Sequence, residues 1–238
     1  MRLPDFLGIG TQKGGTTFLH GLLQQHPQVL LAHPKELHYF SLHHGQGLDW
    51  YANHFAEAKA EQRCGEITPY YLFHPLAAER IHAVIPAVKL IVLLRDPVER
   101  ALSQYFHSRR LGLEPLELEA AFAAEEQRLA DAEAALNQGE AHRSHQQHSY
   151  LSRSRYEQQL PRFEALFTPE QLLVLRSEAL FERPQQLWEQ VLAFLELDAS
   201  PFPPSGSCYA GAGEAAAVPP AVRQQLRERL APTCRWLQ

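Results

Sequence analysis

The 238-residue chain is poor in cysteine, with only Cys64, Cys208 and Cys234, whose spacing does not match a metal site. A sparse and odd set of cysteines indicates a reducing compartment rather than a disulfide-bonded scaffold. Long apolar runs are missing as well, since a run such as residues 90–94 is far too short to cross a bilayer. The first residues also lack the pattern of a signal peptide. These absences predict a cytoplasmic protein without a membrane span.

An excess of positive charge is also missing. The chain has 22 Lys and Arg residues against 27 Asp and Glu residues, which gives a formal net charge of −5. Without a broad positive field we expect no nucleic-acid partner, although a local pocket for a small anion is compatible with this balance. The hydrophobic content of 45% is enough for a full core, so residues 1–238 are expected to form one domain. The sequence gives no indication of an oligomeric state.

Short apolar runs alternate with helical patterns along the chain, and this alternation predicts the fold class. Strands are predicted at residues 6–10, 29–32, 89–94 and 172–175. Helices are predicted at residues 17–25, 76–84, 97–110, 117–136, 156–167, 184–195 and 221–230, with a polar connector at 137–149 and a long loop at 200–220. The pattern indicates an α/β protein with a three-layer, P-loop-like fold, in which helices flank a central parallel sheet.

The segment GTQKGGTT follows the first predicted strand and leads into a helix. Backbone amides at the start of a helix can bind a phosphate, and glycines such as Gly14 and Gly15 let the backbone come close to it. Lys13 can reach a phosphate oxygen, and Thr16 or Thr17 can add a hydroxyl donor. The structural alternative is a tight turn with an exposed lysine, and the loop alone does not decide between the two.

The main functional alternative is a P-loop kinase or NTPase, and the order of residues argues against it. In that motif the Lys follows the last Gly and precedes a Ser or Thr whose hydroxyl holds magnesium. Here Lys13 precedes both glycines. A kinase-type strand would also end in a metal-binding Asp, whereas the strand at residues 90–94 ends in Arg95. A small-molecule kinase is therefore the second hypothesis, and no metal is expected.

Arg95 can form a second anion site together with Ser103, which lies two turns into the following helix. Arg95 would bind the anion through its planar guanidinium group, and Ser103 would donate a hydrogen bond from its hydroxyl. The alternative is an ion pair of Arg95 with Asp96 or Glu99. Two anion-binding strand ends in one sheet favour a ligand with two separated phosphates.

The segment KELHYF places a carboxylate, Glu36, two residues before an imidazole, His38. In an extended segment these two side chains project from the same face. A carboxylate beside an imidazole can share the work of general acid–base catalysis. The alternative is a polar pair that simply faces solvent.

Together these segments resemble the sulfotransferases that use 3′-phosphoadenosine 5′-phosphosulfate (PAPS), and among them the heparan sulfate glucosaminyl N- and O-sulfotransferase branch. TQKGGTT resembles the 5′-phosphosulfate loop of that family and LRDPVERALS its 3′-phosphate motif. KELHYF, continuing to GLDWY, resembles the stretch that holds the catalytic Glu. GEITPYY and residues 156–195 follow the family pattern too, so the similarity covers residues 6–197.

The resemblance implies a mechanism of sulfuryl transfer to a hydroxyl or amine of a saccharide or other small molecule. Glu36 would deprotonate the acceptor, and His38 would position it or stabilise charge. Lys13 would meet the charge that builds up on the leaving 5′-phosphate oxygen.

The resemblance also implies the residues that hold the donor. Amides and hydroxyls of residues 14–17 (Gly14, Gly15, Thr16 and Thr17) would bind the 5′-phosphate. Arg95 and Ser103 would hold the 3′-phosphate, and Tyr156 would line the nucleotide site, with a core tyrosine as the alternative. PAPS is thus the expected co-substrate, without a metal.

The sequence departs from the family at two places. Ile67 occupies the position where the glucosaminyl branch commonly has a Lys that contacts acidic sugar. Residues 207–214 contain one Cys and no Lys or Arg, whereas the family often has a Lys-Gly-Arg there. A relative that binds nucleotide without catalysis is the third hypothesis.

Three further features allow two interpretations each. The histidines of the polar connector, His142, His145 and His148, are expected to lie in a solvated loop rather than at a metal. The acidic helix after Glu117 is either a lid or a solvated surface helix. Trp50 is a better candidate than Trp188 for a sugar platform, although both are expected to be core residues.

Overall fold

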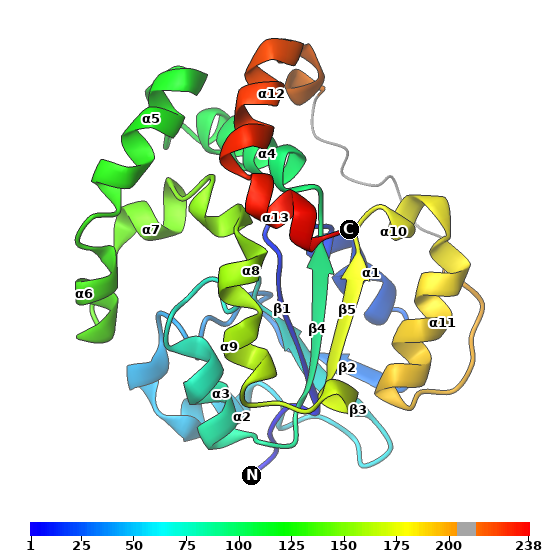
Figure 1. Cartoon of the computed structure of the whole chain (residues 1–238). Helices are drawn as coiled ribbons and strands as arrows, with labels where there is room; N and C mark the ends of the chain where they lie inside the picture. Colours follow the sequence, from blue (N-terminus) through cyan, green and yellow to red (C-terminus); the bar gives the residue numbers. More distant parts are fainter. Residues whose placement is uncertain (204–212) are drawn as a thin grey trace. The chain divides into compact units, whose positions relative to one another are not determined.

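The computed structural model describes residues 1–203 and 213–238 (Figure 1). The described residues fall into two compact units, of which the first includes residues 1–94 and 162–203 and the second includes residues 95–161 and 213–238. The expectation of one domain stays a prediction. No helix among the described residues is both long enough and apolar enough to cross a bilayer.

A parallel sheet organises the first unit. Its strands are β1 (Phe6–Gly10), β2 (Val29–Leu31), β3 (Arg63–Ile67), β4 (Lys89–Leu94) and β5 (Leu172–Arg176). They lie in the order β2-β3-β1-β4-β5, and every neighbouring pair is parallel (Figure 1). Strands β1 and β4 are almost wholly buried, which accounts for their continuous apolar sequences. The predicted α/β class with a central parallel sheet is confirmed.

Helices supply the apolar cover of this sheet. In the first unit these are α1 (Thr16–Leu23), α2 (Leu48–Asn53), α3 (Ala77–Val84), α10 (Ala179–Glu182) and α11 (Pro184–Leu195). Leu22 of α1 and Trp188 of α11 belong to one buried cluster with the strand residues Phe6 and Ile91. Helices α1 and α11 therefore share one core with the sheet, and the assignment of Trp188 to the core is confirmed.

The second unit is helical in its described part. It contains α4 (Pro97–Arg110), α5 (Leu118–Arg128), α6 (Ala132–Asn137), α7 (Arg143–Gln147), α8 (Tyr156–Gln159), α12 (Pro220–Arg229) and α13 (Ala231–Trp236). Helix α9 (Pro161–Glu164) leads from this unit into the first one. Short 3₁₀ turns occur at His44–Gln46, Ser152–Ser154, Pro169–Gln171 and Glu214–Ala217.

Two predicted helices are wrong in their extent. The helix expected at residues 156–167 breaks before Pro161, because a proline lacks the amide and its ring clashes with the preceding turn. The helix expected at residues 221–230 is confirmed as α12, whereas α13, which has Pro232 in its first turn, is not predicted. The helix expected at residues 117–136 is divided by a turn between α5 and α6, and α6 buries Ala132 and Leu136.

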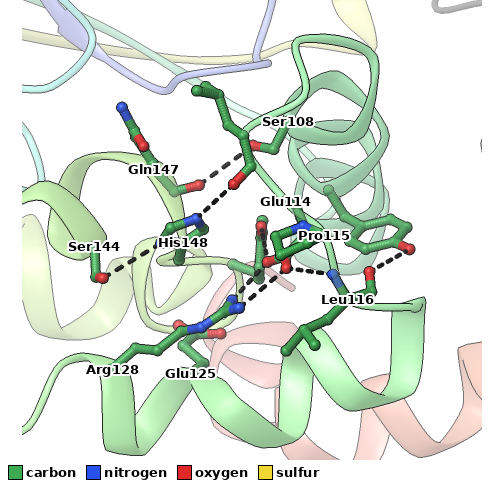
Figure 2. A network of polar contacts seen from close by, with 12 residues as sticks. Ser108, Glu114, Pro115, Leu116, Glu125, Arg128, Ser144, Gln147 and His148 are labelled. Carbon is green, nitrogen blue, oxygen red and sulfur yellow. Dashed lines mark hydrogen bonds and ion pairs between the residues drawn. The ribbon is translucent and has the colours of Figure 1, made fainter.

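A network of polar contacts centred on Glu114 joins α4, α5 and the segment around Tyr150 in the second unit (Figure 2). The Glu114 carboxylate accepts bonds from both terminal nitrogens of Arg128, at 2.6 and 3.0 Å, and from the Tyr150 hydroxyl at 2.7 Å. Burial alone would raise the pKa of Glu114, but the hydrogen bonds from Arg128 and Tyr150 lower it to about 2. This buried ion pair fixes the end of α5.

The polar connector at residues 137–149 is not the solvated loop that the sequence suggests. It forms α7, and His145 is buried, with 8% of its surface exposed. The ring of His148 contacts the carbonyl of Leu113 at 3.1 Å and the hydroxyl of Ser144 at 3.3 Å (Figure 2). His145 and His148 therefore lie against protein groups rather than in open solvent.

Helix α5 is anchored at a second point. The carboxylate of Glu125 accepts the backbone amides of Leu151 at 2.7 Å and Ser152 at 2.8 Å. These buried contacts argue against a freely moving lid, which is one of the two interpretations of the acidic helix after Glu117.

Candidate active site

The phosphate-type loop connects the end of β1 to the start of α1. The Thr11 amide donates to the Leu93 carbonyl of β4 at 3.0 Å, and the Gly14 amide donates to the Thr11 carbonyl at 2.9 Å. Lys13 and Gly15 have φ angles of 68° and 94°, so the loop twice enters the left-handed region. Such alternation turns successive amides to one side, which is the geometry of an anion-binding concavity.

The two glycines that follow Lys13 are required by this geometry. A Cβ atom on Gly14 would lie 2.6 Å from the Leu93 carbonyl oxygen, closer than a real contact allows. A Cβ atom on Gly15 would lie 2.6 Å from the Leu180 side chain, on a backbone that L-residues rarely adopt. Both positions therefore need glycine.

Helix α1 begins directly after Gly15, which provides no capping side chain. The first-turn amides of a helix have no acceptor within the helix, so an anion at this end is stabilised. Thr16 is buried, whereas Thr17 is exposed. Of the two predicted hydroxyl donors, Thr17 is thus the one that faces solvent.

Ser177 braces the loop from β5 and is a site residue that sequence reasoning missed. Its hydroxyl donates to the Gly14 carbonyl at 2.5 Å, and its amide donates to the Leu94 carbonyl at 2.7 Å. A polar residue directly after a strand of a parallel sheet was the available signal, since strand ends meet at one edge.

The segment with Glu36 and His38 is not extended, so one premise of the sequence argument is wrong. Both residues have positive φ angles, 64° and 54°, and neither belongs to a strand. The left-handed backbone nevertheless brings the two side chains together, with 3.7 Å between Glu36 Oε2 and His38 Nε2.

Lys35 is the nearest cation to the predicted base. Its ammonium donates to Glu36 Oε1 at 2.8 Å and to the Thr17 hydroxyl at 3.3 Å. Burial opposes the charged carboxylate, but the hydrogen bond from His38 and the charge of Lys35 outweigh it and lower the pKa of Glu36 to about 2. The Glu36 side chain is 40% exposed, so the carboxylate is ionised and accessible.

His38 is held on two sides. Its Nδ1 atom lies 3.1 Å from the Ser41 hydroxyl, and its backbone amide donates to the Thr68 hydroxyl at 3.4 Å. The Thr68 hydroxyl in turn donates to Glu66 at 2.6 Å. These supporting residues were not predicted from the sequence, and Thr68 lies 30 residues away from His38 along the chain.

Glu66 is 2% exposed and sits among neutral hydroxyl groups. Besides Thr68, it accepts hydrogen bonds from Tyr71 at 2.7 Å and Tyr51 at 2.9 Å. Burial raises the pKa of Glu66, and the three hydroxyl bonds offset only part of this effect. The carboxylate is enclosed, and through the Thr68 hydroxyl it supports the backbone amide of His38.

The predicted second anion motif begins at the first residue of the second unit, Arg95. The Asp96 side chain accepts the amides of Val98 at 3.0 Å and Glu99 at 2.9 Å, so Asp96 caps the start of α4. Glu99 is paired with Arg223.

Tyr156 is fully buried, and its hydroxyl donates to the Arg95 carbonyl at 3.0 Å. It thus supports the backbone of Arg95, while its predicted contact with the nucleotide stays a prediction. Ser103 is half-buried on α4. The neighbouring Arg100 is wholly buried and donates to the Ser154 hydroxyl at 2.6 Å, and burial lowers its pKa to about 10.

A parallel sheet with a glycine-bearing anion loop after β1 defines an α/β protein of the P-loop-like class. Residues 3–207 match the sulfotransferase domain family, and the chain belongs to that family.

Two curated proteins illustrate the relationship. The membrane-associated sulfotransferase kil1 of Dictyostelium discoideum is 47% identical over 109 residues, which are 44% of this chain and 23% of that protein. Human heparan sulfate glucosamine 3-O-sulfotransferase 6 is 41% identical over 104 residues, or 44% of this chain and 30% of that protein. The resemblance to the glucosaminyl branch is confirmed, and the chain spans less than a third of the length of either protein.

A solved structure extends the similarity over nearly the whole chain. The sulfotransferase from Alicyclobacillus acidocaldarius superposes with a TM-score of 0.79 at 26% identity, covering 98% of this chain and 93% of that one. The five-stranded parallel sheet with its flanking helices is therefore a sulfotransferase fold. The roles of the individual site residues stay predictions.

Proposed function

We propose that the protein transfers the sulfuryl group of PAPS to a hydroxyl or amine of a saccharide or another small molecule. The observation that carries this proposal is the Lys35 ammonium, which joins the carboxylate of Glu36 to the Thr17 hydroxyl at the start of α1. The predicted base thus lies one side chain away from the loop that would hold the 5′-phosphosulfate.

The transfer follows from these groups. The acceptor oxygen or nitrogen forms a bond to sulfur while the bond between sulfur and the 5′-phosphate oxygen breaks. The acceptor proton passes to Glu36, and the electron pair of the broken bond stays on the phosphate of the product, 3′-phosphoadenosine 5′-phosphate (PAP). Lys13 and the amides at the start of α1 stabilise this developing charge.

We propose a neutral or weakly charged acceptor rather than a long sulfated polyanion. Ile67, which replaces the family's acid-contacting Lys, is 1% exposed and packs over Gly8 in the core. A polyanion cleft needs many cations, because each neutralised charge releases counterions, and the chain carries a net charge of −5.

A partly exposed indole, Trp50, supports a saccharide acceptor. Trp50 is half-buried, and its ring lies 6.3 Å from Tyr39 and 4.6 Å from His54. Tyr39 follows His38 directly in the chain. A partly exposed indole provides an apolar face on which a sugar ring can stack, so Trp50 is the residue we assign to acceptor binding.

The test is a transfer assay with sulfur-labelled PAPS, comparing neutral saccharides with heparan sulfate at low and physiological salt. We expect labelled neutral product from the wild type and almost none from Glu36→Gln. Sulfation of heparan sulfate alone, with steep salt sensitivity, would contradict the acceptor assignment. Phosphoryl transfer from ATP without any sulfuryl transfer would favour the kinase hypothesis.

A further inference from the structure

Lys35 lies between the first turn of α1 and the predicted base. It follows the turn after β2, and its ammonium reaches two groups with different tasks. One is the Thr17 hydroxyl on the exposed side of α1, and the other is the Glu36 carboxylate. The Lys35 side chain is 22% exposed, so the ammonium is held between protein groups yet borders on solvent.

This pairing makes Glu36 a weak base. A carboxylate whose pKa is near 2 stays ionised at neutral pH but takes up a proton poorly. General-base catalysis is most effective when the pKa of the base lies near the operating pH. His38 and Lys35 both lower this pKa. An opposite charge at this distance lowers a carboxyl pKa by roughly 1–3 units, so removing Lys35 would restore part of the basicity.

A bound donor competes for the same ammonium. The 5′-phosphate would lie against the amides of residues 14–17, beside the Thr17 hydroxyl that Lys35 already contacts. A lysine ammonium has three donors on a flexible stem, and a phosphate carries more negative charge than one carboxylate. Both features favour a turn of Lys35 toward the donor.

We propose that Lys35 is a donor-responsive catalytic residue, which holds Glu36 while the loop is empty and moves to the 5′-phosphosulfate when PAPS binds. This inference rests on the proposed function. The move frees the Glu36 carboxylate to accept the acceptor proton and adds a cation where the leaving phosphate gains charge. The base thereby becomes effective only when a donor is in place.

Other titratable groups also face Glu36. His38 lies on the same segment, and His20 projects from α1, where it feels the charges of both Lys35 and Glu36. Burial and the charge of Lys35 lower the pKa of His20. A pH effect of the Lys35 move must therefore be measured on the Glu36 carboxyl itself rather than on activity alone.

The experiment is a carbon-detected NMR titration of the Glu36 carboxyl between pH 7 and pH 2, with and without PAP, assigned with Glu36→Gln. Lys35→Met is the test variant and Lys59→Met, an exposed lysine of the same unit, is the matched control. PAP binding is measured by calorimetry in the same samples.

We expect PAP to raise the pKa of Glu36 by at least about one unit in the wild type and in Lys59→Met. In Lys35→Met the pKa should already be raised without PAP and should change little when PAP binds. Binding of PAP without a change in the wild type, or with the same change in Lys35→Met, would overturn the inference alone. A protein that does not bind PAP would overturn the proposed function itself.

Discussion

Two buried carboxylates, one in each unit, have similar burial, but their pKa values are shifted in opposite directions. Glu66 and Glu114 are each 2% exposed. Glu66 accepts bonds from three neutral hydroxyl groups, and burial raises its pKa, whereas the guanidinium of Arg128 is among the partners that lower the pKa of Glu114 to about 2. The kind of partner, rather than the degree of burial, decides which form of the acid is stable.

Glu36 is a third case, which combines a cationic partner with exposure to solvent. Arg128 bonds the same carboxylate through two nitrogens, so the pair with Glu114 is structural. Lys35 divides its bonds between Glu36 and Thr17, so its pair can change when a ligand arrives. The comparison separates a carboxylate that stabilises the fold from one that is available for chemistry.

The largest effect is expected for Glu36→Gln. Turnover should fall by ~10²–10⁴-fold, the usual contribution of a positioned general base, while PAP affinity stays nearly unchanged. Steady-state kinetics and calorimetry measure the two quantities, and Glu57→Gln, an exposed glutamate of the same unit, is the control. Turnover close to wild type would show that the base is elsewhere, with His38 as the next candidate.

The next effect concerns stability. Arg128→Met should lower the free energy of unfolding by about 3 kcal/mol, because it leaves Glu114 buried without its cation. Urea unfolding measures this loss, and the double variant Arg128→Met, Glu114→Gln should recover part of it. A loss below about 1 kcal/mol would mean that the pair does not stabilise the second unit.

Charged and neutral partners are also compared at the predicted 3′-phosphate site. Arg95→Ala should weaken PAP binding by about 1.5–3 kcal/mol and Ser103→Ala by about 0.5–1.5 kcal/mol, since hydrogen bonds to charged groups are stronger. Calorimetry with PAP and with adenosine 5′-phosphate measures both. Equal affinity of the wild type for the two nucleotides would remove the second anion site.

The smallest effect is the pH dependence of stability, and its sign differs between the two buried acids. The raised pKa of Glu66 gives stability that is present below the unfolded pKa and is lost as pH rises through the folded value. The lowered pKa of Glu114 gives stability that is present above about pH 4.5 and is lost as pH falls toward 2.

Urea unfolding between pH 3.5 and pH 7 separates these contributions. Glu66→Gln should flatten the loss of stability on the alkaline side of pH 4.5, and Glu114→Gln should flatten the loss on the acidic side. The same change of slope in both variants would contradict the assignment of opposite pKa shifts.

The sequence predicts much of the fold, because local signals decide it. Strand β4 and helix α11 have the expected bounds, since an apolar run and a proline start define them. Strand β3 is not predicted, because Arg63, Gly65 and Glu66 interrupt its apolar pattern. Gly65 is needed there because a Cβ atom would meet the Phe6 ring at 2.5 Å.

Only the parts of the site that lie within one short segment could be predicted from the sequence. The loop and the Glu36–His38 pair are readable from short motifs, although the left-handed backbone of the pair is not. Thr68 and Lys35 act through contacts that the fold creates, so neither periodicity nor spacing marks them, and Ser177 is marked only by its place directly after a strand. The absence of Lys and Arg from the late loop concerns residues 207–212, which lie outside the described residues, and the cytoplasmic location stays a prediction.

The most direct test of the account is calorimetry of PAP binding to the full chain in the presence of EDTA. We expect PAP to bind without divalent metal. We also expect it to bind more tightly than ATP does, with or without magnesium. Tighter binding of ATP with magnesium, or no binding of PAP, would contradict the assignment of the loop and of Arg95 to a sulfuryl donor.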